Sequence, residues 1–374
     1  MLRRFLPPLL IGLVALGAFQ WKVHEKMVDF GVYRQAAQRA LDAEPLFRES
    51  DGHFQFKYLP AFAMATIPFA VADEGTAKLI WFAMSVGALV LLMRWSARFV
   101  PERRRGLPLL IGLTLLFMLK FYVHELGLGQ VNLVFVLLVV AAVGALQSEL
   151  PAVAGVLLGA AVVVKPYGIL FAPWLLVSED RRATVAFAIT FVVALLAPTA
   201  LYGFRGNIAL LLDWWRTVTA TTAPNLMIPD NVSFASVWAR WIGPGRAASV
   251  LATLTGVISL AIVADAWRRR KSVQEPAYLE TAALLVLIPL LSPQGWDYVL
   301  LLSTPAVALL LDRLPEMSRP WRIATWTALG LMGLVVYDLV GRTIYLHFMR
   351  ASIVTLCAMT IVVALAHLRR QQLA

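Results

Sequence analysis

The sequence is poor in the residues that stabilise soluble or disulfide-bonded domains. Its 374 residues include one cysteine, Cys357, so neither an intramolecular disulfide nor a thiolate metal site can form. Charged residues make up 15% of the chain, whereas 60% of the residues are hydrophobic and the mean hydropathy is +0.75. A soluble domain carries about 25% charged residues. We therefore expect a single integral membrane domain, 1–374, that is all-α and stabilised by helix packing.

Several functional motifs are also missing. The chain has no G-x-G-x-x-G and no Walker sequence, which argues against a nucleotide cofactor. It has no His and Asp cluster at metal-ligand spacing, so we expect neither a metal nor another cofactor. The net charge of +11 could suggest a nucleic-acid partner, but the arginines occur in groups of two to four beside apolar runs. These groups indicate membrane topology, with membrane lipids as the partner.

The apolar runs predict a polytopic membrane protein with about twelve transmembrane helices, at roughly 20 residues per crossing. The expected crossings are 5–19, 76–93, 107–123, 131–146, 151–164, 166–177, 183–202, 247–267, 277–291, 296–311, 323–340 and 351–367. A cleaved signal peptide is the alternative for the first run, because it has the same basic start and short apolar core.

The basic residues beside these runs predict the orientation. Cytoplasmic loops of membrane proteins are enriched in Lys and Arg. With Arg3 and Arg4 before the first run, the N- and C-termini are expected in the cytoplasm and the alternate loops outside the cytoplasmic membrane. The other basic residues expected on the cytoplasmic side are Arg94, Arg98, Arg103, Arg104, Arg105, Arg181, Arg182, Arg268, Arg269, Arg270, Lys271, Arg313, Arg319, Arg322, Arg369 and Arg370.

Some apolar segments do not fit a simple crossing. The run 59–71 is short and contains Pro60 and Pro68, and counting it as a span would reverse the arginine-rich loops, so we expect a re-entrant or interfacial helix. The segments on either side of Lys165 and Pro166 are short as well. We expect a broken pair there that reaches only partway across the membrane.

Two long outer loops are expected, at 20–58 and 203–246. In the first, the run 28–41 repeats apolar residues at helical spacing, which predicts an interfacial helix. Its polar face would carry Arg34, Gln35, Gln38 and Arg39. In the second, Trp214 and Trp215 are typical of an aromatic belt at the membrane surface.

Polar residues that could perform chemistry all fall on the outer side. Asp29, near the bilayer surface, could be a general base with a raised pKa, or it could cap the helix that it begins. Lys57 and Tyr58 lie in an aromatic, cationic entrance to the run 59–71, which could hold a lipid or a sugar ring or could only anchor the interface. The turn after His124 carries Glu125, Gln130 and Asn132, whose side chains could bind hydroxyl groups or cap a helix.

Further candidates follow along the chain. Lys165 lies within an apolar region, where an ammonium is costly unless it meets an anion such as phosphate or extends to water. Asn231 lies in the second outer loop. Trp296, Asp297 and Tyr298 form a polar turn between two spans, where an indole beside a carboxylate could bind a sugar.

Taken in order, these motifs resemble glycosyltransferase family 87. The resemblance rests on Asp29, on Phe-Lys-Tyr-Leu-Pro at 56–60, on Gly-Gln-Val-Asn at 129–132, on Lys-Pro at 165–166, on Asn-Val-Ser at 231–233 and on Ser-Pro-Gln-Gly-Trp-Asp-Tyr at 292–298. The family contains polyprenyl-phosphate-mannose-dependent α-1,2-mannosyltransferases of the GT-C fold. The resemblance spans nearly the whole chain, and the order and spacing of the short motifs make it specific.

The resemblance implies roles for these residues. Asp29 would be the general base of an inverting displacement, Lys165 would lie near the donor phosphate with Lys57 and Tyr298, and Gln130 with Asn132 would shape the pocket. Tyr298 stands where the family usually has a histidine. Tyrosine is neutral at pH 7 and cannot neutralise a phosphate as an imidazolium can.

The expected function is transfer of a hexose, with mannose as one candidate, from a polyprenyl-phosphate donor to a lipid or glycan acceptor on the outer face. The alternatives are a secondary transporter or lipid flippase, and a non-catalytic subunit of envelope assembly. A transporter keeps its polar residues near the bilayer midplane and shows two related halves. This chain shows neither pattern.

Overall fold

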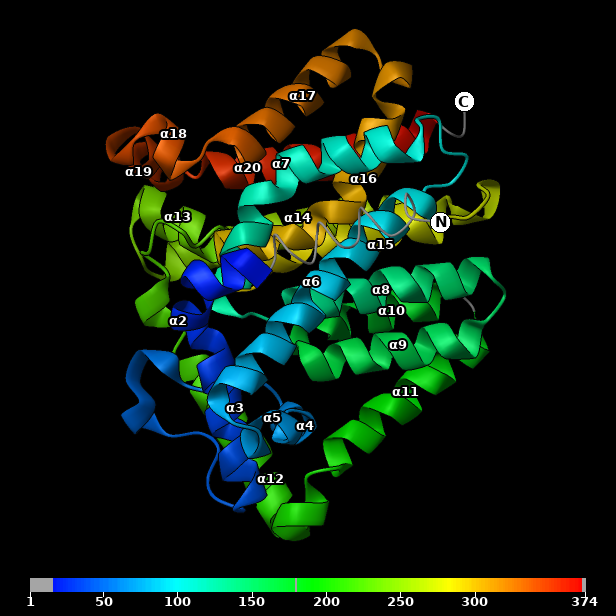
Figure 1. The fold of residues 1–374 in the computed structure, drawn as a ribbon. Helices are drawn as coiled ribbons and strands as arrows, with labels where there is room; N and C mark the ends of the chain where they lie inside the picture. Colours follow the sequence, from blue (N-terminus) through cyan, green and yellow to red (C-terminus); the bar gives the residue numbers. More distant parts are fainter. Residues whose placement is uncertain (1–15, 179, 372–374) are drawn as a thin grey trace.

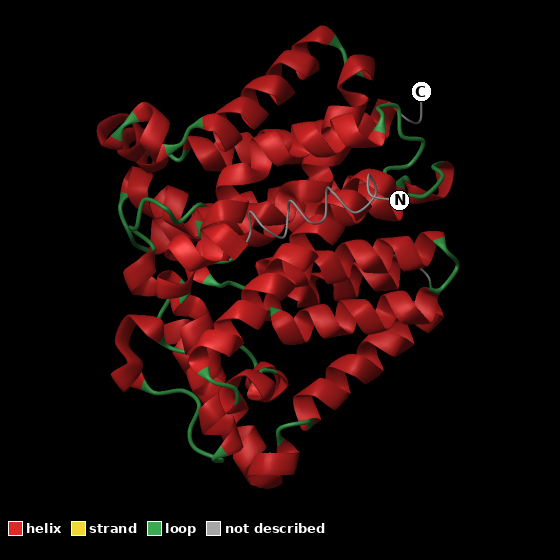
Figure 2. Cartoon of the chain, in the orientation of Figure 1, coloured by secondary structure: helices red, strands yellow, loops and turns green. Residues whose placement is uncertain are grey.

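The protein is described by a computed structural model that covers residues 16–178 and 180–371. Over these residues the chain is helical, as expected (Figure 2). The β-structure that occurs there is an isolated bridge between Asn231 and Trp296. The predicted first crossing, 5–19, and its basic start at Arg3 and Arg4 lie almost wholly outside the described residues.

The helices differ widely in length. The α-helices are α2 (His24–Lys26), α3 (Val28–Leu41), α4 (Pro60–Ala65), α5 (Ile67–Val71), α6 (Glu74–Arg98), α7 (Leu107–Leu128), α8 (Asn132–Gln147), α9 (Pro151–Val164), α10 (Phe171–Val177), α11 (Arg181–Leu196), α12 (Thr199–Ala220), α13 (Phe234–Ile242), α14 (Arg246–Arg268), α15 (Ala277–Leu291), α16 (Thr304–Arg313), α17 (Arg319–Leu334), α18 (Tyr337–Val340), α19 (Arg342–Arg350) and α20 (Ile353–Gln371). The π- and 3₁₀-segments are η1 (Phe19–Val23), η2 (Glu49–Phe54), η3 (Pro166–Leu170), η4 (Ala223–Asn225), η5 (Arg270–Ser272), η6 (Asp297–Ser303) and η7 (Leu314–Glu316).

Within the described residues, five helices are long and apolar enough to cross a membrane: α6, α7, α14, α20 and the continuous segment Asp297–Glu316. A sixth crossing is possible if the bent pair Arg181–Leu196 and Thr199–Asn225 forms one span, although its halves meet at 89°. The remaining apolar helices, including α8, α9 and α15, are shorter. The chain is therefore a multi-pass membrane protein, and its described residues contain five or six helices of full spanning length, while the expected count of about twelve crossings stays a prediction.

The short helices follow local sequence signals. The expected interfacial helix coincides with α3, and the run 59–71 forms α4 and α5, two short helices that pack against α3. The break at Lys165 is also confirmed: α9 ends at Val164, and the chain continues through η3 into α10. Arg39 is an exception, because its guanidinium is buried in an ion pair with Asp51 at 2.6 Å instead of lying on an exposed polar face.

The segment 203–246, which we expect to be an outer loop, contains much of helix α12 and all of α13. Helix α12 continues through it to Ala220, after a kink at Gly203, where φ is +69°. Its indoles differ in environment, because Trp214 donates a hydrogen bond to the Lys57 carbonyl at 3.1 Å while Trp215 is largely exposed.

Arginine-rich loops meet at one end of the helix bundle, which we call the arginine end (Figure 1). There the side chain of Arg105 donates to the Leu311 carbonyl at 2.7 Å, and Arg313 donates to the Pro101 carbonyl at 2.6 Å. Arg369, at the end of α20, donates to the Pro276 carbonyl at the start of α15. These contacts join loops far apart in sequence, so the arginine clusters share one end as the sequence predicts.

Helix α15 lies at the centre of the molecule. Thirteen of its residues are apolar or small, and every residue from Ala277 to Leu290 is buried, as expected for a helix that is hydrophobic on all sides. The helix begins near Arg369 at the arginine end and ends at Leu291. The polar turn 292–298 therefore emerges at the opposite end, which we call the cavity end.

Candidate active site

A cavity of about 480 Å³ opens at the cavity end. Its wall combines the start of α3, the segment before α4, the end of α7, the break after α9, one side of α12 and the turn 292–298. The polar and aromatic residues around it are Asp29, Tyr33, His53, Phe54, Gln55, Lys57, Tyr58, His124, Gln130, Lys165, Tyr167, Trp214, Thr222, Asp230, Ser292, Gln294, Trp296, Asp297 and Tyr298.

Asp29 lies at the second position of α3 and faces this cavity. Met27 occupies the cap position, and no side chain makes a capping hydrogen bond, so the prediction that Asp29 caps its own helix is wrong. Burial raises the pKa of the Asp29 carboxyl above its usual range, while a hydrogen bond from Gln130 and the charge of Lys165 oppose that rise. A carboxylate with a raised pKa accepts a proton more readily.

Gln130 is the centre of a buried hydrogen-bond network. Its Oε1 accepts from the hydroxyls of Tyr33 at 2.8 Å and Tyr58 at 3.1 Å, and from the Lys165 ammonium at 3.2 Å. Its Nε2 donates to the Tyr298 hydroxyl at 3.4 Å. Residues more than a hundred positions apart are thus joined at one amide.

Lys165 reaches this network because the chain breaks beside it. The residue has an extended backbone (φ −143°, ψ 118°), and Pro166 cannot donate the amide hydrogen that would continue α9. Its ammonium donates to the Tyr58 hydroxyl at 2.7 Å and lies 4.5 Å from the centre of the Tyr58 ring. The side chain is buried, so the alternative that it extends to water at a helix end is not what the structure shows.

Glu125 and Asn132 form a second buried pair behind Gln130. The Asn132 amide donates to Glu125 Oε2 at 2.8 Å, and the Tyr167 hydroxyl donates to Asn132 Oδ1 at 2.7 Å. The turn between them depends on Gly129, whose φ is +68° and whose Cβ, if present, would lie 2.9 Å from Phe30. This pair therefore fixes the turn that carries Gln130 and supports helix α3.

The turn 292–298 is held by the segment that precedes α13. Asn231 donates to the Pro293 carbonyl at 2.8 Å, and the amide hydrogen of Val232 donates to the Gly295 carbonyl at 2.7 Å. Only glycine fits at position 295, because a Cβ there would lie 1.8 Å from the Pro289 carbonyl oxygen. Asn231 is fully buried and positions this turn.

Lys57 connects three parts of the wall. Its ammonium donates to Gln294 Oε1 at 3.2 Å, and the Gln294 amide donates to the Thr221 hydroxyl at 3.1 Å. Burial lowers the pKa of the Lys57 ammonium, although the charge of Asp29 opposes the change. Lys57 thus lies at the rim, within the electrostatic influence of the Asp29 carboxylate.

The structure brings together most of the residues that the sequence predicts. Eight of them line the one cavity: Asp29, Lys57, Tyr58, Gln130, Lys165, Trp296, Asp297 and Tyr298. Three do not: Glu125, Asn132 and Asn231 are buried beside it, with side chains that are hydrogen-bonded to other parts of the chain. Their predicted direct binding of substrate stays a prediction, and their geometry is that of supports.

Sequence reasoning missed several lining residues, among them Tyr33, His53 and Tyr167. Tyr33 had a usable signal, because it lies four residues after Asp29 and so shares its helix face. Tyr167 lies directly after the Lys-Pro motif. No group of three or more His, Cys, Asp or Glu side chains within the described residues is arranged to hold a metal ion.

Comparison with known proteins assigns this chain to a family. The family model of glycosyltransferase family 87 matches residues 56–293, which is well over half of the chain. The chain belongs to glycosyltransferase family 87. It is therefore an enzyme that transfers a sugar, and the alternatives of a transporter, a flippase and a non-catalytic subunit are not retained.

A curated relative of this family 87 enzyme is the polyprenol-phosphate-mannose-dependent alpha-(1-2)-phosphatidylinositol mannoside mannosyltransferase of Mycobacterium tuberculosis (strain ATCC 25618 / H37Rv). The two chains are 28% identical over 213 residues, which cover 50% of this chain and 49% of the relative. The matched part thus spans about half the length of that relative. It is what this chain resembles, and the similarity is confined to that half.

Proposed function

We propose that this enzyme transfers a hexose, with mannose the first candidate, from a polyprenyl-phosphate donor to a lipid or glycan acceptor. The observation that carries the proposal is the single cavity in which the Asp29 carboxylate and the Lys165 ammonium lie around Gln130. In a glycosyl transfer, a base can deprotonate the acceptor hydroxyl and a cation can stabilise the departing phosphate. The named donor of the mycobacterial relative supports the choice of a polyprenyl-phosphate sugar.

In the proposed reaction, Asp29 acts as the general base. It removes the proton from an acceptor hydroxyl, whose oxygen then forms a bond to the anomeric carbon of the sugar. The bond between that carbon and the phosphate oxygen breaks on the opposite side, and its electrons remain on the polyprenyl phosphate. This single displacement inverts the anomeric configuration. The raised pKa of Asp29 suits a base near neutral pH.

Lys165 stabilises the charge that develops on the departing phosphate. Its position is preorganised, because Tyr58 and Gln130 accept two of its three N–H bonds while the cavity remains open beside it. A fixed cation in a partly buried site stabilises a developing anion more than a mobile one, since no reorganisation is needed during the reaction.

The membrane arrangement is part of the same proposal. The cavity end faces the outside of the cytoplasmic membrane and the arginine end faces the cytosol, as the positive-inside rule requires. We count the shorter apolar helices together with the full-length spans, which gives about twelve membrane segments of a GT-C fold. Some of the shorter helices cross only part of the membrane. In this arrangement a lipid-linked donor enters the cavity from the outer leaflet.

Chemical labelling tests this orientation. In a Cys357→Ser background, His53→Cys at the cavity end and Arg103→Cys at the arginine end are treated with a membrane-impermeant maleimide on intact cells. We expect labelling at position 53 and none at 103 until the membrane is permeabilised. The reverse pattern contradicts the proposed orientation without affecting the proposed chemistry.

The reaction is tested with Asp29→Asn, assayed with radiolabelled polyprenyl-phosphate-mannose and a glycolipid extract as the acceptor. Loss of the base should lower the transfer rate by about 10²–10⁴-fold. Asp42→Asn, at the exposed end of the same helix, is the matched control and should retain full activity. Wild-type rates for Asp29→Asn would exclude this residue as the base, and a wild type that transfers no mannose would exclude the proposed donor.

A further inference from the structure

His124 is a cavity residue to which the proposed reaction assigns no role. It lies near the end of α7, where its ring packs edge-on against Tyr298 with 4.9 Å between ring centres. Its Nδ1 lies 3.9 Å from Asp297 Oδ1, and its side chain is 49% exposed where the Asp297 side chain is 9% exposed. One ring nitrogen thus faces a buried carboxylate while the rest of the ring faces the open cavity.

Several charged groups surround His124. Three carboxylates interact with it electrostatically: Asp297 beside the ring, Asp230 from the loop before α13 and Asp29 across the cavity. Opposing charge comes from Lys120, one turn earlier on the same helix, whose ammonium donates to the Val335 carbonyl. Negative groups therefore outnumber positive ones around the imidazole.

Two further groups face this cluster. The Tyr345 hydroxyl on α19 hydrogen-bonds to Asp297, and Arg240 on α13 interacts with Asp230. Arg240 is otherwise engaged, because its guanidinium donates to the Asn231 carbonyl at 2.8 Å and to the Ser352 hydroxyl at 2.8 Å. It holds the loop and does not line the cavity.

His124 and Lys165 lie at the two ends of one row of contacts. Lys165 bonds to Gln130, Gln130 bonds to the Tyr298 hydroxyl, and the Tyr298 ring contacts His124. A phosphate placed over the neutral Tyr298 would therefore have a cation on either side. Lys57 is a weaker candidate for the second cation, since it already donates to Gln294 at the rim.

We propose that His124, which lies beside Asp297 and Tyr298, is a second contact for the donor phosphate, opposite Lys165, and a cationic one when protonated. The proposal rests on the proposed function and extends it. It explains how a tyrosine can occupy position 298, because the positive charge comes from the facing helix. It also makes donor binding dependent on pH, since an imidazole loses its charge near neutral pH.

Equilibrium binding of polyprenyl-phosphate-mannose to the purified enzyme without acceptor tests this proposal. The phosphodiester keeps one negative charge throughout, so only protein groups titrate. We expect wild-type affinity to fall as the pH rises from about 5.5 to 7. His124→Gln should bind about 10–100-fold more weakly at the acid end, as expected for loss of a charged hydrogen bond, and should show no such pH dependence.

Two variants complete the design. His347→Gln removes an exposed histidine of α19 that does not line the cavity and should behave as the wild type. The double variant His124→Gln, Tyr298→His returns an imidazole to the same row and should restore both affinity and pH dependence. Weaker binding with an unchanged pH dependence would make His124 a structural support and overturn the proposal. Absence of wild-type binding at every pH would instead count against the proposed donor.

A second, separate observation concerns a groove of about 420 Å³ that adjoins the cavity. The two share His53, Gln55 and Lys57, and the groove continues between η2 and the end of α12. Its other lining residues are Glu49, Gly52, Arg216, Thr217, Ala220, Thr221, Pro224 and Asn225. Hydrogen-bonding side chains predominate there and no Phe, Tyr or Trp ring contributes, in contrast to the wall of the cavity.

We infer that this groove binds the hydroxyl-rich head group of the acceptor. Alternating donors and acceptors such as Gln55, Thr217 and Glu49 suit a polyol, and the charge of His53 at the shared wall interacts with Asp29. An acceptor bound there has a direct path to the base. The inference rests on the proposed function and identifies the place of its second substrate.

Ala220→Trp tests the inference by filling the groove with an indole at a position that does not line the cavity. With radiolabelled polyprenyl-phosphate-mannose and a glycolipid extract, we expect transfer to lipid to fall at least about tenfold, which is a loss of about 1.4 kcal/mol, because the indole occupies the space of the head group. Donor binding should be unchanged. Thr219→Trp, on the exposed side of α12, is the control. Undiminished transfer by Ala220→Trp, or loss of donor binding with it, would overturn the inference.

Discussion

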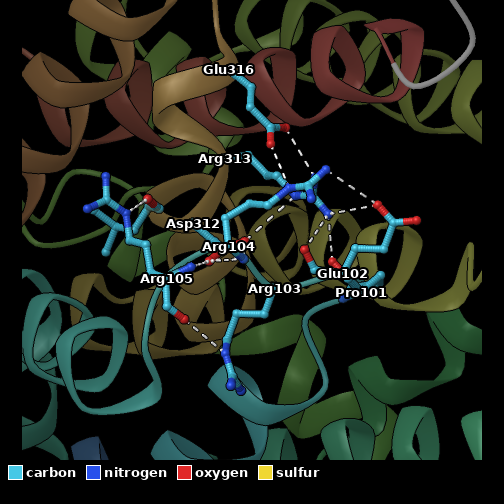
Figure 3. A network of polar contacts seen from close by, with 9 residues as sticks. Pro101, Glu102, Arg103, Arg104, Arg105, Asp312, Arg313 and Glu316 are labelled. Carbon is cyan, nitrogen blue, oxygen red and sulfur yellow. Dashed lines mark hydrogen bonds and ion pairs between the residues drawn. The ribbon is translucent and has the colours of Figure 1, made fainter.

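Buried charged side chains have different partners at the two ends of the bundle. At the arginine end, the buried Asp312 carboxylate accepts backbone hydrogen bonds from Arg104 at 2.9 Å and Arg105 at 2.8 Å, and Arg313 pairs with Glu316 at 3.1 Å (Figure 3). At the cavity end, no carboxylate among the described residues lies within 4.0 Å of the Lys165 ammonium, which is bonded to neutral groups.

The difference shows which charges serve the fold. A buried carboxylate surrounded by donors is satisfied without a ligand, so the arginine end is a structural clamp between the α6–α7 loop and α16. A buried ammonium held by a hydroxyl and an amide keeps part of its charge available. The cavity end therefore holds a positive charge that can pair with an anionic substrate. Four experiments test this comparison.

Breaking the clamp should have the largest effect on stability. Asp312→Asn removes the charge that accepts from two backbone amides and lies beside Arg313, and we expect a loss of about 3–5 kcal/mol of unfolding free energy. Thermal unfolding in detergent measures it. Glu316→Gln, at an exposed pair, should change stability by about 0–1 kcal/mol. Equal stability of Asp312→Asn and wild type would refute the clamp.

Removing the cavity cation should affect function instead. Lys165→Met deletes a charged contact worth about 1.5–3 kcal/mol, so donor affinity should fall about 10–100-fold. Unfolding temperature should be maintained, because an uncompensated buried charge is lost. Lys78→Met, at a surface pair with Glu74, is the control for both measurements. A marked loss of stability with intact donor binding would assign Lys165 to the fold.

The turn 292–298 should be intolerant of added volume. Gly295→Ala forces a methyl group toward the Pro289 carbonyl, and overpacking of this kind costs about 1–3 kcal/mol. Activity and unfolding temperature should fall together, since the turn carries cavity residues. Gly127→Ala has open space around its Cβ and should be neutral or slightly stabilising. Wild-type behaviour of both variants would show that the turn can shift.

The smallest expected effect is a fall of the transfer rate at acid pH. Asp29 is active as the carboxylate, and its pKa is raised, so activity should be lost as the pH falls through that raised value and retained above it. The rate should decrease about tenfold per pH unit below the pKa. His124→Gln should keep this limb, measured at saturating donor. An acid limb no higher than that of an exposed aspartate would contradict the burial of Asp29.

Local structure could be predicted well because local signals decide it. Periodicity placed α3 at its observed bounds, and Pro166 marked the end of α9. The number of full crossings was harder, since α8, α9 and α15 are apolar yet shorter than a membrane-spanning helix. Hydropathy measures burial in any apolar medium, and a helix enclosed by protein, such as α15, gives the same signal as one in lipid.

The candidate site residues could also be predicted only in part. Asp29, Gln130 and Lys165 could be proposed from residue type and position, and they share the cavity. Glu125 and Asn231 have the same polar character but turn toward the protein, because a neighbouring backbone or side chain satisfies them. Whether an amide faces a ligand or a backbone carbonyl depends on segments that pack from elsewhere in the chain.

By itself the sequence determined the membrane class, the shared end of the arginine clusters and the kinds of polar group in the short motifs. These follow from composition and local periodicity, which each segment carries independently. Only the tertiary structure decided that Lys165 meets Tyr58, that Asp297 faces His124 and that Asn231 supports a turn sixty residues away. Such pairings depend on long-range packing, because short-range polar contacts form only after distant helices have fixed their positions.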